Sequence, residues 1–294
     1  MASVEGKRIL LSGASSGIGE RAAQILAEGG ASLALVARRE TRLRRLSDAI
    51  AAQGHPAPVI LAADLSRPGA ASEVAQRATE ALGAIDVLVN NAGGSIQGLS
   101  WVAGDRAEAR AVFETNLWSP LALVAAVAPS MIERGEGAIV NTGSMIQISP
   151  FPHLGHYAAS RAALASITET IRLELRPRGV RVVEVAFGPV DTAGSTENRL
   201  LSGGPEWLEG RPGIGKLEDA ARTLVKAIEG PAEGIVFYPR LLRWVHGLPA
   251  FGRRYARQSA KRADLSDTSV RVGGSAGDPA IQAAREEWER ALRS

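Results

Sequence analysis

The sequence predicts an α/β fold, a doubly wound parallel sheet flanked by helices, and two observations carry this prediction. Seven short apolar runs rich in β-branched residues alternate with segments of helical periodicity. The runs are continuously apolar and do not alternate with polar residues, as expected for strands that helices cover on both faces. Strands separated by helices pair in parallel, so we expect a Rossmann-like sheet of seven strands.

The seven predicted strands are each four to seven residues long, which suits a strand and is too short for a buried helix. In chain order they are Arg8–Ala14, Ser32–Ala37, Val59–Ala62, Ile85–Asn90, Ala138–Thr142, Val180–Ala186 and Ile235–Tyr238. Apolar residues at helical spacing predict helices at Glu20–Glu28, Ala107–Met131 and His156–Leu175. The carboxyl ends of the strands form a crevice, where we expect the ligand site.

Residues 1–240 are expected to form the main, Rossmann-like domain, and residues 241–294 a C-terminal extension. Within the extension, Pro239–Arg262 interleaves large apolar residues with arginines and is predicted to be an amphipathic basic segment. Ser266–Pro279 is rich in Ser, Gly and Asp, which predicts a mobile linker. A short charged helix is expected at Ala280–Leu292.

The composition narrows the classes of protein. With 294 residues, of which 45% are hydrophobic, the chain can bury one large core and carry an appendage, but two full domains are not expected. It has no cysteine, which excludes disulfides, thiolate catalysis and cysteine-based metal sites, and its four scattered histidines predict no metal site. A net charge of +3 is too weak a field to predict nucleic-acid binding.

The sequence also suggests where the protein acts. Met1–Lys7 runs straight into the apolar segment Ile9–Leu11, without a charged region followed by a signal-peptide core, so we expect a cytoplasmic protein. The longest apolar stretch, around Leu121–Ala128, is far shorter than the roughly 18 residues that span a bilayer. We therefore expect no transmembrane segment.

A glycine-rich turn follows the first predicted strand. It reads Ser12-Gly13-Ala14-Ser15-Ser16-Gly17-Ile18-Gly19 and leads into a predicted helix. Glycines at these positions allow a tight bend, close approach of backbone N–H groups to a pyrophosphate, and close packing of helix on strand. The strand before it and the helix after it are the context that this motif requires, so a dinucleotide site is predicted here.

The end of the second predicted strand indicates which dinucleotide. A site that prefers NAD carries an acidic residue there, whereas this chain has Ala37 followed by Arg38 and Arg39. An arginine can hold a 2′-phosphate through charge-assisted hydrogen bonds, so NADP is predicted, with Arg38 as the first candidate and Arg39 as the second. Both arginines could instead simply begin a solvated basic helix.

A second group of residues forms the predicted catalytic site. Ser144, Tyr157 and Arg161 form the pattern Ser-x12-Tyr-x3-Arg, and Tyr157 and Arg161 lie four residues apart on one helix face. Together with the glycine turn, Asn90-Asn91-Ala92-Gly93 and Asn116, this pattern closely resembles the short-chain dehydrogenase/reductase family over about Arg8–Tyr238. The usual site of that family reads Ser, Tyr-x3-Lys and Asn, and here Arg161 stands at the lysine position.

The resemblance implies a role for each of these residues. Ser144 would polarise a substrate carbonyl, Tyr157 would act as general acid, and Asn116 would hold a supporting water. A free tyrosine, with a pKa of about 10, ionises reluctantly, and a neighbouring cation favours its phenolate. Arg161 keeps the cation but never releases a proton, so a lysine-based proton relay is not available.

The resemblance also implies which residues meet the cofactor. Asp64 would meet the adenine, although it could equally begin a helix, and Val190 and Thr192 would address the carboxamide of the nicotinamide. The complete expected set is Gly13, Ser15, Ser16, Gly17, Ile18, Gly19, Arg38, Arg39, Asp64, Leu65, Asn90, Ala92, Gly93, Tyr157, Arg161, Val190 and Thr192. Phe187 replaces the usual proline of the family; it could reshape the pocket floor or, as we expect, pack in the core.

The expected function is therefore NADPH-dependent hydride transfer to a small molecule with a carbonyl or related C=X group. Two alternatives stay open. Halohydrin dehalogenases share the Ser-x12-Tyr-x3-Arg pattern but carry an aromatic residue in the glycine turn, where this chain keeps glycine. The arginine could also have silenced the chemistry and left an NADP-binding scaffold.

Three regions remain to be placed. Ala193–Gly215, polar and rich in Gly and Pro, is expected to be a substrate lid. Residues 241–257 are expected to fold over the substrate pocket, with contact to a membrane surface or an oligomer partner as alternatives. By resemblance to the family, the long middle helices would pair chains into a homodimer or homotetramer.

Overall fold

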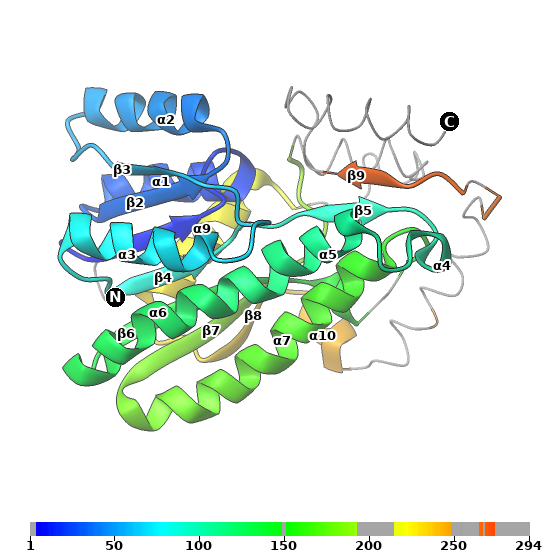
Figure 1. The fold of residues 1–294 in the computed structure, drawn as a ribbon. Coiled ribbons are helices and arrows are strands. Elements are labelled where there is room, and N and C mark those ends of the chain that lie inside the picture. Colours follow the sequence, from blue (N-terminus) through cyan, green and yellow to red (C-terminus); the bar gives the residue numbers. More distant parts are fainter. Residues whose placement is uncertain are drawn as a thin grey trace.

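Seven parallel strands form the central sheet of the computed structural model, in the order β3-β2-β1-β4-β6-β7-β8 (Figure 1). The structure describes residues 4–148, 151–192, 215–247, 254, 265–266 and 268–273. The strands of this sheet are β1 (Arg8–Ser12), β2 (Ser32–Ala37), β3 (Val59–Ala62), β4 (Val87–Asn90), β6 (Gly137–Ser144), β7 (Val180–Phe187) and β8 (Gly234–Tyr238). The predicted α/β architecture and all seven strands are confirmed.

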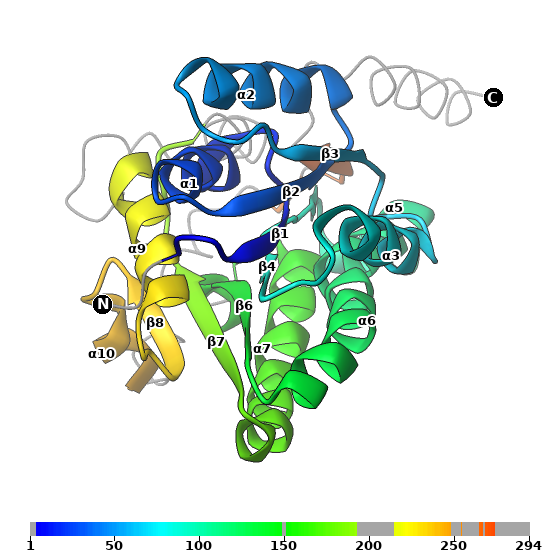
Figure 2. The same cartoon turned by 90° about the vertical axis from the view of Figure 1, so that its left-hand side faces the viewer.

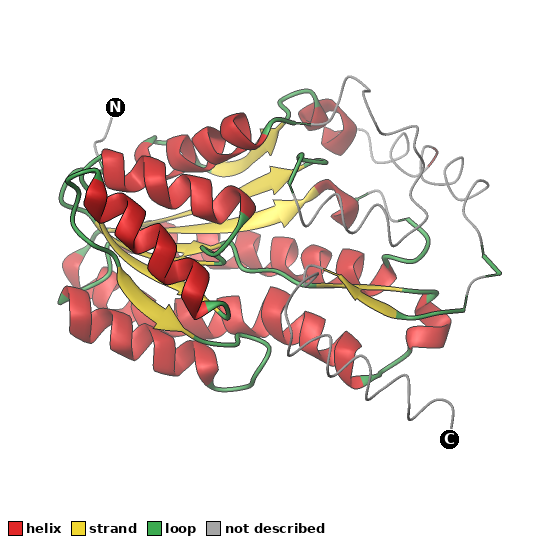
Figure 3. Cartoon of the chain, turned by 90° about the horizontal axis from the view of Figure 1, so that it is seen from above, coloured by secondary structure: helices red, strands yellow, loops and turns green. Residues whose placement is uncertain are grey.

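Helices cover both faces of the sheet, as Figures 2 and 3 show. They are α1 (Gly17–Glu28), α2 (Glu40–Ala52), α3 (Ala70–Leu82), α4 (Ser100–Ala103), α5 (Ala107–Phe113), α6 (Ser119–Arg134), α7 (Gly155–Leu175), α9 (Leu217–Glu229) and α10 (Leu242–Gly247). Short helical turns occur at η1 (Glu114–Trp118), η2 (Met145–Gln147) and η3 (Arg176–Arg178).

The continuous apolar runs of the sequence are explained by two cores. Ile9 and Leu11 of β1 belong to the core under α1, α2 and α9, whereas Leu10 belongs to the opposite core under α3, α6 and α7. All three side chains are fully buried. Successive residues of a strand point to opposite faces, so a strand with two covered faces needs apolar residues at every position.

The order of the strands locates the ligand crevice. β1 pairs with β2 on one side and with β4 on the other, so the strand order reverses at this point. In open parallel sheets, ligands bind at the carboxyl ends of the strands beside such a reversal. The glycine turn follows β1, and the segment Asn90–Gly93 follows β4 at the same edge.

A second, two-stranded sheet was not predicted. β5 (Ser95–Gln97) pairs in antiparallel fashion with β9 (Arg271–Gly273), to one side of the main sheet (Figure 3). Ile96 and Val270 are buried there with apolar residues of α4 and α5. The prediction of a mobile linker at Ser266–Pro279 is therefore wrong at β9. It was based on polar composition, whereas β9 is held by backbone pairing with β5, which composition does not indicate.

The predicted helix Ala107–Met131 consists of three pieces. α5 passes into the π-helical turn η1 and then into α6, which ends at Arg134. By length and composition the run Ala107–Arg134 is apolar enough to cross a membrane, but half of its apolar window is buried inside the protein, as in core helices. Burial against the sheet and α3 accounts for the apolar character of α6.

Several predicted regions lie outside the described residues. These are nearly all of the predicted lid at Ala193–Gly215, the helix predicted at Ala280–Leu292, and the part of 241–257 that follows α10, apart from Arg254. Gly215, at the end of the predicted lid, forms a parallel bridge with Val190.

Candidate active site

The glycine turn has the geometry of a phosphate cradle. Gly13 and Gly17 adopt φ values of +73° and +58°, which favour glycine. A Cβ atom on Gly13 would lie 2.8 Å from the backbone of Ala92, and one on Gly19 would collide with the carbonyl oxygen of Gly13. The turn can therefore close only with glycine at these positions, and it leaves the N-terminal N–H groups of α1 free of side-chain caps.

Two residues hold this turn in place: Ser12, which was not among the predicted cofactor residues, and Asn91, which belongs to the segment Asn90–Gly93 predicted to line the adenosine. The hydroxyl of Ser12 accepts hydrogen bonds from the backbone N–H groups of Asn91 and Ala92, at 3.0 and 3.1 Å. The Asn91 side chain donates in return to the carbonyl oxygens of Ser12 and Gly13, both at 3.2 Å. The double Asn of the sequence was the available signal, but it did not show which of the two side chains faces the turn.

The two candidate arginines for the 2′-phosphate differ in position. Arg39 reaches back to the glycine turn, donating from Nη2 to Ser16 Oγ at 2.7 Å and to Ser15 Oγ at 2.9 Å. Arg38 is exposed beside it. The guanidinium of Arg39 thus already lies over the phosphate cradle, while the role predicted first for Arg38 stays a prediction.

Arg161 is buried at the centre of the site, with 6% of its surface exposed. Its Nη1 donates to the carbonyl oxygen of Thr142 at 3.0 Å, and its guanidinium carbon lies 5.4 Å from the centre of the Tyr157 ring. A Cβ atom on Gly93 would collide with Nη2. Arg161 Nε is buried and has no hydrogen-bond acceptor among the described residues. A buried, unsatisfied donor of this kind is suited to a ligand oxygen.

Asn116 supports this centre from the π-helical turn η1 and is completely buried. Its Oδ1 accepts from the N–H of Gly94, and its Nδ2 donates to the carbonyl oxygen of Gly94 and to Ser160 Oγ, all at 2.9 Å. Asn116 therefore ties the segment after β4 to α7. The role predicted for it, holding a water, stays a prediction.

Tyr157 and Ser144 complete the predicted chemical group. Tyr157 lies in the first turn of α7 and is half-buried, and Ser144 is the last residue of β6. Ser144 Oγ makes a long contact of 3.4 Å with the N–H of Ile146, at the limit of a hydrogen bond. The hydroxyl therefore keeps its donor proton for another acceptor.

The other predicted cofactor residues take several positions. Thr192 lies against Gly17, because a Cβ atom there would be 3.5 Å from its methyl group. Asp64 Oδ1 accepts hydrogen bonds from the backbone N–H and the hydroxyl of Ser66 in a local turn, and the alternative that Asp64 begins a helix is wrong, because α3 begins at Ala70. Leu65 is buried in the core, with its carbonyl taken by Ser119.

The side chains of Asn90 and Phe187 are both buried in the core. Asn90 is buried and donates to Asn141 Oδ1 at 2.8 Å, so its side chain braces β4 against β6. Phe187 packs edge-on against Tyr238 with ring centres 6.3 Å apart, in agreement with the core role expected for it.

Glu184 of β7 is a charged residue that the sequence reading did not select. It is 2% exposed, and burial raises the pKa of its carboxyl above the usual 4.5. Gln147 Nε2 donates to its Oε1 at 3.0 Å. A single Glu within an apolar strand was the available signal, but only the fold shows which face of the sheet it occupies.

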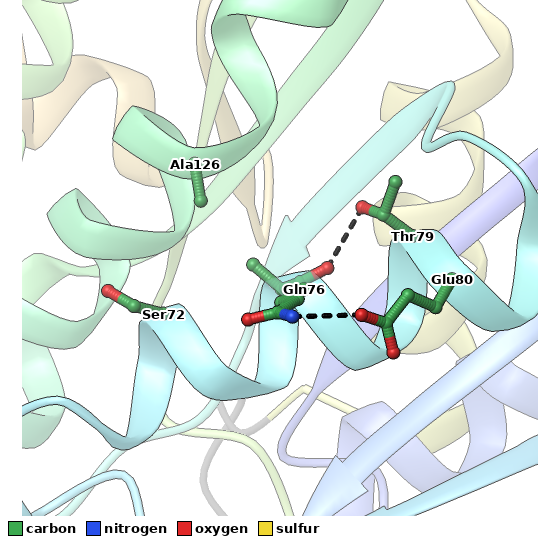
Figure 4. Close-up of a pocket in the computed structure, with 6 residues that line it drawn as sticks. Ser72, Gln76, Thr79, Glu80 and Ala126 are labelled. Atoms are coloured by element: carbon green, nitrogen blue, oxygen red, sulfur yellow. Dashed lines mark hydrogen bonds between the residues drawn. The ribbon is translucent and has the colours of Figure 1, made fainter.

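A shallow pocket of about 350 Å³ lies elsewhere on the surface, between α3 and α6 (Figure 4). Its lining residues are Ser72, Ala75, Gln76, Thr79, Glu80 and Ala126. Gln76 donates to Glu80 within this lining, at 2.8 Å. None of the predicted catalytic or cofactor residues borders this pocket, so we do not assign it to the active site.

Comparison with known proteins decides the family. The family model for short chain dehydrogenases matches residues 7–200. The chain belongs to this family. It is 34% identical to the ketoacyl reductase HetN of a Nostoc species, over 80% of either chain. It is 38% identical to a short chain dehydrogenase of Pseudocercospora fijiensis over 67% of this chain and 62% of that longer protein.

A solved structure of the family is also similar. It is a short-chain dehydrogenase from Sphingobium yanoikuyae in complex with NADPH, with 29% identity and a TM-score of 0.71 over 87% of this chain and 95% of that one. Membership of the family makes this protein an oxidoreductase by descent. The cradle at Gly13–Gly19, Arg39 above it and the orphaned Nε of Arg161 fit a dinucleotide in the same crevice.

Proposed function

We propose that this protein is an NADPH-dependent reductase of a small carbonyl or related C=X compound. The observation that carries the proposal is Arg39. Its guanidinium lies on the hydroxyls of Ser15 and Ser16, and no acidic residue follows β2 before Glu40. A cation here favours the 2′-phosphate of NADP, whereas an acidic residue at the end of β2 would favour NAD.

The residues of the site divide the reduction between them. NADPH, when bound, supplies the hydride. Ser144 Oγ donates a hydrogen bond to the carbonyl oxygen, and Tyr157 gives that oxygen the proton that completes the alcohol. Arg161, whose guanidinium is 5.4 Å from the ring centre, stabilises the phenolate left on Tyr157. Asn116 keeps α7 and Gly94 in register so that these groups stay in place.

The first experiment is a titration of the purified protein with NADPH, NADH, chloride and bromide, followed by nicotinamide fluorescence and thermal stability. We expect tight NADPH binding, weaker NADH binding and no effect of halide. Arg39→Ala should weaken NADPH binding about tenfold or more, the size of a lost charge-assisted hydrogen bond, and leave NADH binding almost unchanged.

Arg38→Ala is the matched control, because it removes the same charge one residue away. A larger loss from Arg38→Ala than from Arg39→Ala would move the 2′-phosphate to Arg38. Stabilisation by halide without nucleotide binding would overturn the proposal in favour of epoxide and dehalogenation chemistry. NADPH binding without turnover across a panel of carbonyls would favour a silent scaffold.

We also propose that the protein assembles through α5–α6 and α7, in the cytoplasm. Trp118, at the end of η1 between α5 and α6, and Leu173 of α7 support the assembly, because they are large apolar side chains that are 55% and 66% exposed. Light scattering coupled to gel filtration should give a dimer or tetramer. Trp118→Asp together with Leu173→Asp should give a smaller species, and an unchanged mass would place the interface elsewhere.

A further inference from the structure

Glu184 lies directly behind the catalytic end of the sheet. It pairs in register with Asn141 of β6, and its carboxylate rests over Gly143, where a Cβ atom would collide with Oε1. Gly143 precedes Ser144. Only glycine at position 143 leaves room for the carboxylate of Glu184, so the carboxylate is closely packed against this residue.

Arg161 contacts the neighbouring residue of β6 from α7. Its Nη1 is bound to the carbonyl oxygen of Thr142, the neighbour of Gly143, and its charge attracts that of Glu184. Both groups are more than nine-tenths buried. In such surroundings charge–charge attraction is much stronger than in water, so Arg161 favours the charged form of Glu184, and each group affects the orientation of the other.

Packing alone does not account for an acid at this position. Gln147 donates to Oε1, and an amide oxygen of a glutamine would accept that hydrogen bond equally well. Burial without a full set of partners disfavours the charged carboxylate. The charge of Glu184 therefore makes the fold less stable than a neutral isostere would, and a counter-charge for a buried arginine is a use that offsets this cost.

We propose that Glu184 is a positioning residue: the negative charge of its carboxylate, placed at Gly143 beside the carbonyl group that binds Arg161, helps to keep the guanidinium of Arg161 at β6 and reduces the positive charge that Tyr157 experiences. The first part rests on the burial of both groups at neighbouring residues of β6, and the part concerning Tyr157 rests on the proposed reductase function. The charged groups that face Glu184 are Arg161, Arg172 and Glu169, all from α7. Arg172 attracts Glu184 more strongly than Arg161 does, but Arg172 is ion-paired with Glu169, whereas Arg161 makes no ion pair with an acid among the described residues.

A double-mutant cycle on the unliganded protein tests the first part. Thermal unfolding is measured at pH 8 for the wild type, Arg161→Met, Glu184→Gln and the double variant. We expect Arg161→Met to lower the melting temperature by about 3 °C more when Glu184 is present than in the E184Q background, because it strands a buried carboxylate. Arg161→Lys, which keeps the charge, should cost the same in both backgrounds.

Equal losses from Arg161→Met in both backgrounds would overturn the proposal. Should Arg161→Met fold in neither background, the E184Q variant alone decides. Its melting temperature should then rise relative to the wild type as pH increases from 5 to 8, and a constant difference would count against a charged Glu184. The matched control is Glu174→Gln, an exposed acid on α7 that should show neither coupling nor pH dependence.

The pH profile of carbonyl reduction tests the second part. Removal of a negative charge behind Arg161 favours the phenolate, so Glu184→Gln should move the profile of kcat to lower pH while Glu174→Gln leaves it unchanged. An unmoved profile together with intact coupling to Arg161 would confine Glu184 to holding the arginine. A wild type that reduces no carbonyl would instead refute the proposed function, and the unfolding cycle would still decide the role of Glu184.

Discussion

Two acidic side chains are buried against the same sheet, and they differ in their hydrogen-bond partners. Asp86 lies just before β4, at the amino end of the strands, and Glu184 lies towards the carboxyl end of β7. Asp86 accepts two hydrogen bonds from the Arg8 guanidinium, at 2.7 and 2.9 Å, and a third from the Arg8 backbone at 3.0 Å. Among the described residues, Glu184 accepts a hydrogen bond from one donor, the neutral amide of Gln147.

The pKa values of these two carboxyl groups are therefore shifted in opposite directions. Hydrogen bonds from Arg8 lower the pKa of Asp86 below its usual 3.8, whereas burial raises the pKa of Glu184 above 4.5. A fully paired carboxylate stabilises the folded state, whereas burial of an incompletely paired one disfavours its charged form. The acid at the amino end of the sheet thus stabilises the fold, whereas the acid towards the carboxyl end, beside the predicted catalytic residues, is buried at a cost in stability.

The largest expected effect is on the reaction itself. Tyr157→Phe should lower kcat of carbonyl reduction about 10²- to 10⁴-fold, because it removes the general acid, and should leave the melting temperature almost unchanged. Tyr238→Phe is the matched control, since that hydroxyl donates to the carbonyl oxygen of Lys216 outside the site. Substantial activity in Tyr157→Phe would remove the tyrosine from the mechanism.

The next effect is on stability at the opposite end. Asp86→Ala should lower the free energy of unfolding by about 1–3 kcal/mol, since Arg8 loses its bidentate partner, while kcat stays the same. Asp105→Ala, which breaks the exposed pair with Arg110, should cost less than about 0.5 kcal/mol. If Asp86→Ala instead lowered kcat without a loss of stability, the division between the two ends of the sheet would be wrong.

The difference in melting temperature between the wild type and Asp86→Asn should depend on pH. A carboxyl whose folded pKa is lowered stabilises the fold above its unfolded value, and this stability is lost as pH falls through the folded pKa. The melting temperature of the wild type should therefore fall towards that of Asp86→Asn as the pH drops below about 4. Parallel melting curves down to pH 2 would show that the Arg8 pair does not stabilise the protein.

The smallest effect is expected at Glu184, with the opposite sign. A carboxyl whose folded pKa is raised contributes stability that is complete below its unfolded value and is lost as pH rises through the folded pKa. Glu184→Gln should therefore match the wild type near pH 4 and exceed its melting temperature by a few degrees at pH 8. A variant less stable than the wild type at pH 8 would show that Glu184 is fully paired there.

Local sequence determined most of the fold. All seven strands of the main sheet begin or end within three residues of their predicted bounds, because each is a short apolar run between turn-forming residues. The glycine turn and the Ser-x12-Tyr-x3-Arg pattern could also be predicted from the sequence. The pattern places its side chains at the end of one strand and on the first turns of one helix. Spacing along the chain fixes such positions before any long-range contact forms.

Tertiary structure alone decided the rest. The choice of Asn91 to hold the glycine turn, the reach of Arg39 to Ser16 and the pairing of β5 with β9 all join residues that lie far apart in the sequence. The same holds for Glu184, which lies against Gly143 only because β6 and β7 pair in one register. Composition shows which residues are present, but the register and approach of distant segments decide which charges and hydrogen-bonding groups meet.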